Sequence, residues 1–224
     1  MNLIPSRETQ LLRDHFANEL TAPVTIELYT QRESRIILPI QECATCKDTR
    51  ELLTEVAGLA DSIRLEVHDF VAETEGARAA GIDRIPAFVL KGAAKGRVRY
   101  FGIPSGYEFT SLIQDLTDVS RGTTDLAAAT REALAGLTTD VHIKVFVTPT
   151  CPYCPGIAHL AHQFAIESPR ITADVIEASE FPDLVQRYGV SGVPRTIINE
   201  TIDVMGAVPE ASLLEAVLET QKAA

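Results

Sequence analysis

The sequence lacks any run of about 18 apolar residues, so it predicts no membrane-spanning helix. It also lacks a lysine- or arginine-rich block, and its formal net charge is -11. Nucleic acid and anionic membrane surfaces are therefore not expected partners. Residues 1–10 lack the positive segment and apolar stretch of a secretory signal, so we expect a cytoplasmic protein.

No cysteine is left unpaired by the sequence pattern. The four cysteines form two C-x-x-C pairs, Cys43/Cys46 and Cys151/Cys154. In a reducing compartment such pairs are more often redox-active or metal-binding than structural, and each closes too small a loop to constrain much chain. A shared zinc site is disfavoured, because 104 residues separate Cys46 from Cys151, whereas zinc ribbons space their pairs by about 15 to 20 residues.

The sequence contains an internal repeat. A shift of 108 residues superimposes the two cysteine pairs and also carries Pro86 onto Pro194, so each unit has a proline 43 residues after its first cysteine. A chain of 224 residues with 46% hydrophobic content can form two cores. We predict two domains, 1–120 with a Cys-Ala-Thr-Cys site and 121–224 with a Cys-Pro-Tyr-Cys site, joined by the small-residue linker 120–123.

Apolar periodicity alternates between helical and strand spacing in both units, which predicts an α/β fold. The expected elements of the first unit are a helix over 7–20, a strand over 24–30, a helix over 46–60, a strand over 63–70, a helix over 74–80, a hairpin ending at Gly102 and a helix over 107–119. Those of the second are a helix capped by Thr124, a strand over 141–147, a helix over 154–166, a strand over 171–178, a helix over 182–188, a hairpin ending at Gly206 and a helix over 209–222.

The chemistry is expected at the cysteine pair that follows the strand over 141–147. A cysteine in the first turn of a helix is favoured as thiolate by unpaired N–H groups and the helix dipole. We predict that Cys151 attacks a disulfide and that Cys154, one turn further into the helix, resolves the mixed disulfide. Pro152 and Tyr153 between them are expected to tune the thiolate. The pair Cys43/Cys46 is predicted to act in the same way.

The first unit has about nine more residues than the second before its cysteine pair, within 31–42. One interpretation is a surface loop whose apolar part, 36–40, packs against the domain. The other is a flap that limits access to Cys43 or contacts a partner. The sequence leaves both open.

The duplicated pattern resembles the thioredoxin and glutaredoxin superfamily, and most closely the two-domain, glutaredoxin-like protein disulfide oxidoreductases. The resemblance rests on segments 145–155, 99–106 and 118–121 and covers nearly the whole chain. It implies two tandem thioredoxin-fold units, each a mixed central sheet flanked by helices. It also implies cis peptide bonds before Pro86 and Pro194, which only an X-Pro bond makes energetically accessible.

The resemblance implies a thiol-disulfide oxidoreductase that exchanges disulfides with protein substrates, as reductase, oxidase or isomerase. Extended substrate segments would pair with the backbone of Val193 beside Pro194 and of Ile85 beside Pro86. No organic cofactor is implied, because the cysteines carry the electrons. Implied partners are a thioredoxin reductase and a peroxiredoxin. An alternative from another class is a tandem thioredoxin-like module that binds peptides without turnover.

The predicted site departs from thioredoxins at the proton acceptor. Thioredoxins proper bury an acid six residues before the first cysteine, and in the second unit that position is Val145. Glu177 and Glu167 are the candidate acceptors that the sequence offers there. Neither oligomeric state nor reduction potential is predicted.

Overall fold

The computed structural model describes residues 3–31 and 43–222. Residues 32–42, which hold nearly all of the predicted insertion, lie outside the described residues. Both interpretations of that segment therefore stay predictions. None of the described helices combines the length and the apolar character needed to cross a lipid bilayer.

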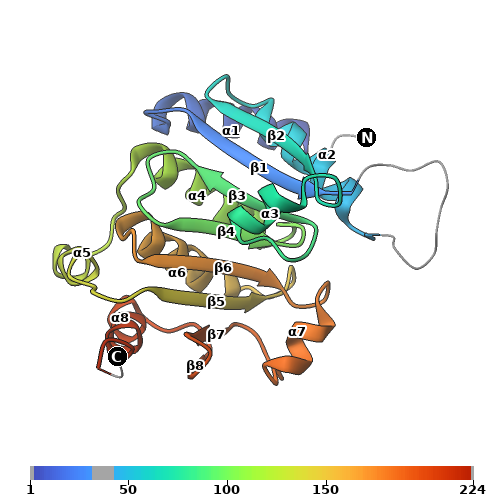
Figure 1. The fold of residues 1–224 in the computed structure, drawn as a ribbon. Coiled ribbons are helices and arrows are strands. Elements are labelled where there is room, and N and C mark those ends of the chain that lie inside the picture. Colours follow the sequence, from blue (N-terminus) through green and yellow to red (C-terminus); the bar gives the residue numbers. More distant parts are fainter. Residues whose placement is uncertain (1–2, 32–42, 223–224) are drawn as a thin grey trace.

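The fold is built on one eight-stranded mixed sheet with the strand order β2-β1-β3-β4-β6-β5-β7-β8 (Figure 1). Each unit contributes four strands in the same relative order, as the repeat predicts. The strands are β1 (Val24–Thr30), β2 (Ile63–Asp69), β3 (Ala87–Lys91), β4 (Arg97–Phe101), β5 (Val141–Val147), β6 (Ile171–Glu177), β7 (Arg195–Ile198) and β8 (Ile202–Met205). The helices are α1 (Ser6–Glu19), α2 (Cys46–Ala57), α3 (Thr74–Ala80), α4 (Glu108–Arg121), α5 (Ala128–Ala135), α6 (Cys154–Glu167), α7 (Pro182–Arg187) and α8 (Glu210–Glu219).

The two units share this sheet because β4 of the first pairs in parallel with β6 of the second, in a register that sets Arg97 opposite Thr172 and Phe101 opposite Ile176. Each unit thereby covers one edge strand of the other, and exposed strand edges are prone to unwanted pairing. A domain boundary near residue 120 stays a prediction, since the sheet continues from one unit into the next.

The first half of the predicted linker, residues 120–121, is helical. Helix α4 continues to Arg121 and ends at Gly122, whose φ of +67° favours glycine. A Cβ at Gly122 would lie 2.6 Å from the Cβ of Ala93, so only glycine fits. The predicted cap at Thr124 is wrong, because its backbone N–H and hydroxyl both donate to the carboxylate of Glu167, at 2.8 and 2.9 Å, and α5 begins only at Ala128.

Apolar side chains bury both faces of the sheet. The larger core lies under α1, α2, α4 and α6, and the smaller one lies under α3 and α7, which Figure 1 shows in front of the sheet. Successive residues of β5 alternate between them: Val145 and Val147 face the larger core and Phe146 faces the smaller. The helical layer behind the sheet therefore contains the start of α6 and with it the second cysteine pair.

A buried acid and two histidines join α4 of the first unit to α6 of the second. Asp115 accepts from Nδ1 of both His159 and His162 at 2.6 Å, and Nε2 of His162 lies 3.0 Å from the carbonyl oxygen of Arg99. Burial alone would lower the pKa of His162, but Asp115 outweighs this and raises that pKa. Burial alone would raise the pKa of Asp115, but His162 and His159 hold it below its usual range.

This cluster predicts a pH dependence of stability. The contribution of His162 is complete below its unfolded pKa of about 6.5 and is lost as pH rises through the higher folded value, while that of Asp115 is present above about 3.9 and is lost as pH falls through the lower folded value. Asp115→Asn should therefore lower the free energy of unfolding most between about pH 4 and 6.5. Urea titrations across pH test this. An equal loss at pH 5 and pH 9 would contradict it.

Candidate active site

The second cysteine pair lies where β5 gives way to α6. The strand ends before Pro149, whose missing N–H cannot continue the ladder. A turn follows, in which the N–H of Cys151 donates to the carbonyl of Thr148 at 3.1 Å. Cys151 and Cys154 form a disulfide with their Cα atoms 5.5 Å apart. Cys151 is 9% exposed and Cys154 is fully buried, so only the first sulfur is near the surface.

The helices predicted over 46–60 and 154–166 begin where predicted, at Cys46 and Cys154, but the expectation that Cys151 lies in the first helical turn, with Cys154 one turn further in, is wrong. Helix α6 begins at Cys154, so Cys151 lies three residues before it. The first pair has the same arrangement, with Cys46 as the first residue of α2 and Cys43 before it. In both units the residues between the two cysteines form a turn that comes before the helix. The second cysteine, rather than the first, therefore occupies the helix start.

The second site includes the predicted proline loop. The bond between Val193 and Pro194 is cis, as the resemblance implies, and the carbonyl oxygen of Val193 lies 3.9 Å from Sγ of Cys151. Pro152 and Tyr153 are exposed at the turn, with Tyr153 72% exposed. The structure thus brings the predicted attacking sulfur to the predicted substrate-binding backbone.

The first site has its own proline loop and a cavity. The bond between Ile85 and Pro86 is cis, and both residues line a cavity of about 650 Å³ together with Cys43, which is partly exposed. Cys43 and Cys46 form a disulfide with the Cα atoms 5.5 Å apart, and Cys46 is 4% exposed. The opposite wall of the cavity comes from the second unit and includes Glu180. Both units therefore build the first site.

The two predicted proton acceptors of the second pair lie in different places. The prediction of Glu167 as acceptor is wrong, because this residue ends α6, about 20 Å along the helix from Cys154. Its carboxylate accepts a hydrogen bond from the ammonium of Lys95 at 3.0 Å. Glu177 is buried, and its two oxygens accept from the backbone N–H groups of Ser179 and Glu180 at 3.2 and 2.8 Å. It lines the cavity of the first site, and its role at the second pair stays a prediction.

Helices α4 and α6 pack side by side in the same direction. At their starts, the N–H of Tyr107 donates to the carbonyl of Pro149 at 3.0 Å. Further along, Asp115 pairs with His162. Residues that come later in α4 therefore contact residues that come later in α6. The first residues of both helices lie at the same end of the packed pair.

Those first residues are Glu108 and Cys154, and Glu108 is a candidate that sequence reasoning missed. Its side chain is fully buried, one oxygen accepts from the hydroxyl of Ser111 at 3.2 Å, and Oε1 has no hydrogen-bond partner among the described residues. Burial raises the pKa of Glu108 to about 7. A carboxyl group with such a pKa exchanges protons readily near neutral pH.

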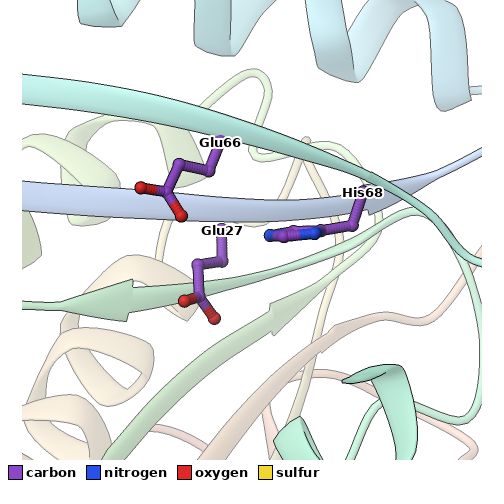
Figure 2. Close-up of side chains that lie close together, drawn as sticks. All are labelled: Glu27, Glu66 and His68. Atoms are coloured by element: carbon purple, nitrogen blue, oxygen red, sulfur yellow. The ribbon is translucent and has the colours of Figure 1, made fainter. Parts of the chain in front are cut away.

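A further cluster lies on β1 and β2, away from any cysteine. Glu27 and Glu66 face each other across the parallel strands, and His68 lies on the same side of the sheet (Figure 2). Their ligand atoms lie within 4.8 Å of one another, which suits a metal ion in principle. However, the ammonium of Lys91 is 2.5 Å from Glu27, and Nδ1 of His68 pairs with Glu73 at 2.8 Å. Since Glu27 and His68 already have these partners, we assign the cluster no metal.

Comparison with known proteins adds three kinds of relative. A family model described as a thioredoxin domain matches residues 141–219. A protein disulfide oxidoreductase from Aeropyrum pernix is 29% identical, with a TM-score of 0.86 over 98% of this chain and 94% of that one. The NTD_N/C domain of alkylhydroperoxide reductase AhpF from Enterococcus faecalis is 26% identical, with a TM-score of 0.83 over 95% of this chain and 99% of that one.

Longer curated proteins match as well. The F subunit of alkyl hydroperoxide reductase from Pseudomonas aeruginosa is 27% identical over 204 residues, which is 89% of this chain and 37% of that protein. The corresponding protein of Xanthomonas campestris is 28% identical over 175 residues, which is 76% of this chain and 31% of that protein. The chain spans about a third of the length of these relatives.

Proposed function

Because the chain is a two-unit disulfide oxidoreductase of the thioredoxin superfamily, we propose that it passes electrons from its dithiols to the disulfides of protein substrates, chiefly at the second site. The observation that carries this is the reach of Cys151: its sulfur is near the surface and against the carbonyl of Val193, while Cys154 is buried behind it. An extended substrate segment bound at Val193 would present its disulfide to Cys151. The products are a substrate dithiol and a Cys151–Cys154 disulfide, so electrons balance without an organic cofactor.

The names of the relatives support a choice of partners. Several are components of alkyl hydroperoxide reductase, so a peroxiredoxin that removes peroxides is the proposed acceptor, and a thioredoxin reductase is the proposed donor. A cytoplasmic location suits these partners, because dithiols remain reduced there. A separate part of the proposal is that the chain also reduces glutathione mixed disulfides, which would be a glutaredoxin-like activity.

Reduction of insulin with dithiothreitol as electron source tests the proposal. We expect insulin to be reduced, and its B chain to precipitate, much faster with the protein and dithiothreitol together than with dithiothreitol alone. The alternative, a peptide-binding module without turnover, predicts the rate of dithiothreitol alone together with saturable binding of extended peptides. The rate at which the protein reduces a glutathionylated peptide, measured in parallel, tests the proposed activity on glutathione mixed disulfides.

Glu108 is proposed as the group that takes the proton of Cys154 when this cysteine resolves the mixed disulfide. We expect Glu108→Gln to slow insulin reduction at pH 7 by about a hundredfold, the lower end of what general acid–base groups contribute. The inflection near pH 7 in the pH–rate profile should also disappear. The measurement uses a Cys43→Ser/Cys46→Ser background, so that only the second site turns over.

The matched control for Glu108 is Glu215→Gln, which removes an exposed carboxylate from α8. Its rate and pH profile should equal those of the background protein. The raised pKa of Glu108 means that burying its charged form opposes folding, so glutamine at this position should not destabilise the chain at pH 8. An unchanged pH profile in a folded Glu108→Gln protein would contradict the assignment.

A further inference from the structure

A carboxylate of the second unit is bound to the turn that carries the first cysteine pair. Glu180 follows β6, and its Oε2 accepts a hydrogen bond from the hydroxyl of Thr45. Its Oε1 accepts from the backbone N–H of Ile103 at 2.7 Å. Since Thr45 stands between Cys43 and Cys46, the second unit is attached directly to the first dithiol turn.

The surrounding backbone holds Glu180 in this position. Glu177 accepts from the N–H of Glu180 at 2.8 Å and fixes the turn that presents it. Gly102 leaves room for the carboxylate: its φ is +100°, and a Cβ there would lie 2.7 Å from Oε1 of Glu180. The N–H of Gly102 donates to the carbonyl of Pro86 at 2.8 Å, which connects the carboxylate to the proline loop of the first site.

Glu180 and Cys43 line the same cavity, together with Ile85 and Pro86. Cys43 is the partly exposed member of its pair and Cys46 is buried, so a substrate disulfide that enters this cavity meets Cys43 first. The sulfur that leaves the substrate is then released into a space of about 650 Å³ that a carboxyl group borders. A thiolate released there needs a proton.

We propose that Glu180 of the second unit is the proton carrier for disulfide exchange at the first site. The inference rests on the proposed function. The thiolate of Cys43 attacks the substrate disulfide, forms a mixed disulfide and releases one substrate thiolate, which takes the proton of the Glu180 carboxyl group. Cys46 then gives its thiol proton to the Glu180 carboxylate and attacks Cys43. The Cys43–Cys46 disulfide forms, and the second substrate thiolate leaves and takes its proton from water.

The ionisation of Glu180 agrees with this role. Burial raises its pKa, the nearby charge of Glu177 adds to this, and the hydrogen bonds from Thr45 and Ile103 oppose it. The protonated form is thus more available near neutral pH than for an ordinary glutamate. The titratable groups that interact electrostatically with Glu180 are Glu177, on the last turn before it, and Tyr100 of β4.

The test uses the full chain with Cys151→Ser and Cys154→Ser, so that only the first dithiol reacts. Glu180→Gln is compared with Glu132→Gln, which removes an exposed carboxylate from α5. Two quantities are measured after reduction: the pH dependence of Cys43 alkylation by iodoacetamide, and the rate of insulin reduction at pH 7. A third variant, Thr45→Val, keeps the carboxylate but removes its hydrogen bond to the turn.

The two quantities should change in opposite senses in Glu180→Gln. Loss of a negative neighbour should lower the midpoint of Cys43 alkylation by about one pH unit, while loss of the proton carrier should slow insulin reduction by about a hundredfold. Thr45→Val should slow insulin reduction in the same direction but less, which keeps the test valid if Glu180→Gln fails to fold. Glu132→Gln should change neither quantity.

Equal rates and equal alkylation profiles in Glu180→Gln and Glu132→Gln would overturn the proposal. A parallel loss of alkylation and exchange would also overturn it, because that pattern indicates only a disturbed turn. Failure of the proposed function is recognised separately: the wild-type chain with all four cysteines would then not reduce insulin at all.

Discussion

In a chain whose first dithiol has been removed by Cys43→Ser and Cys46→Ser, the further change Cys151→Ser is expected to reduce insulin turnover to the rate of dithiothreitol alone. Serine keeps the size of the side chain, but its hydroxyl neither forms a disulfide nor ionises near neutral pH. Cys154 does not replace it, because this sulfur is fully buried. With the first dithiol intact, Cys151→Ser should leave the smaller rate of that site.

The companion variant Cys154→Ser gives a different result if Cys151 is the attacking cysteine. The mixed disulfide between Cys151 and the substrate would form but would not be resolved, so a covalent complex should accumulate and disappear on reduction. Cys151→Ser should form no such complex. Glu215→Gln serves as the control, because it changes an exposed side chain on α8 outside the site. Equal turnover in Cys151→Ser and its parent would reject the second site.

The architecture of each unit could be predicted because its signals are local. The strands over 24–30 and 141–147 have the predicted bounds, since short apolar runs with clear breaks define them. The pairing of β4 with β6 was not predictable in this way. It joins edge strands of different units, and such a contact leaves no periodicity in either strand.

The residues of the candidate sites show the same difference between signals within one unit and contacts between units. Cysteines and prolines could be predicted from their spacing within one unit, and the structure brings Cys151 to Val193 as the family resemblance implies. The acids could not, because each reaches its site from the other unit. One signal was nevertheless available: Glu108 and Glu180 correspond, through the 108-residue shift, to Ala216 and Ala72. A repeat in which one copy exchanges alanine for glutamate marks a position where the units differ in chemistry.

The contact between the units also contains a buried charge pair. Arg99 of β4 lies opposite Asp174 of β6, and its guanidinium donates two hydrogen bonds to that carboxylate, at 2.6 and 2.9 Å. Their side chains are 6% and 5% exposed. Arg99 also donates to the carbonyl of Gly81 at 2.7 Å, and Nε2 of His142 lies 2.6 Å from Asp174. Burial alone would raise the pKa of Asp174, but His142 and Arg99 hold it below its usual range.

Arg99→Leu is expected to lower the free energy of unfolding by about 3–5 kcal/mol, because it leaves the carboxylate of Asp174 buried without its main partner. The double variant Arg99→Leu/Asp174→Leu should recover much of this loss, since replacing both members of a buried pair by apolar residues is often neutral. Arg170→Leu, which breaks the exposed pair with Asp140, should change stability little. Urea unfolding of the oxidised proteins measures all three. If the single and double variants lose the same free energy, the loss comes from packing around Arg99 and not from an uncompensated charge.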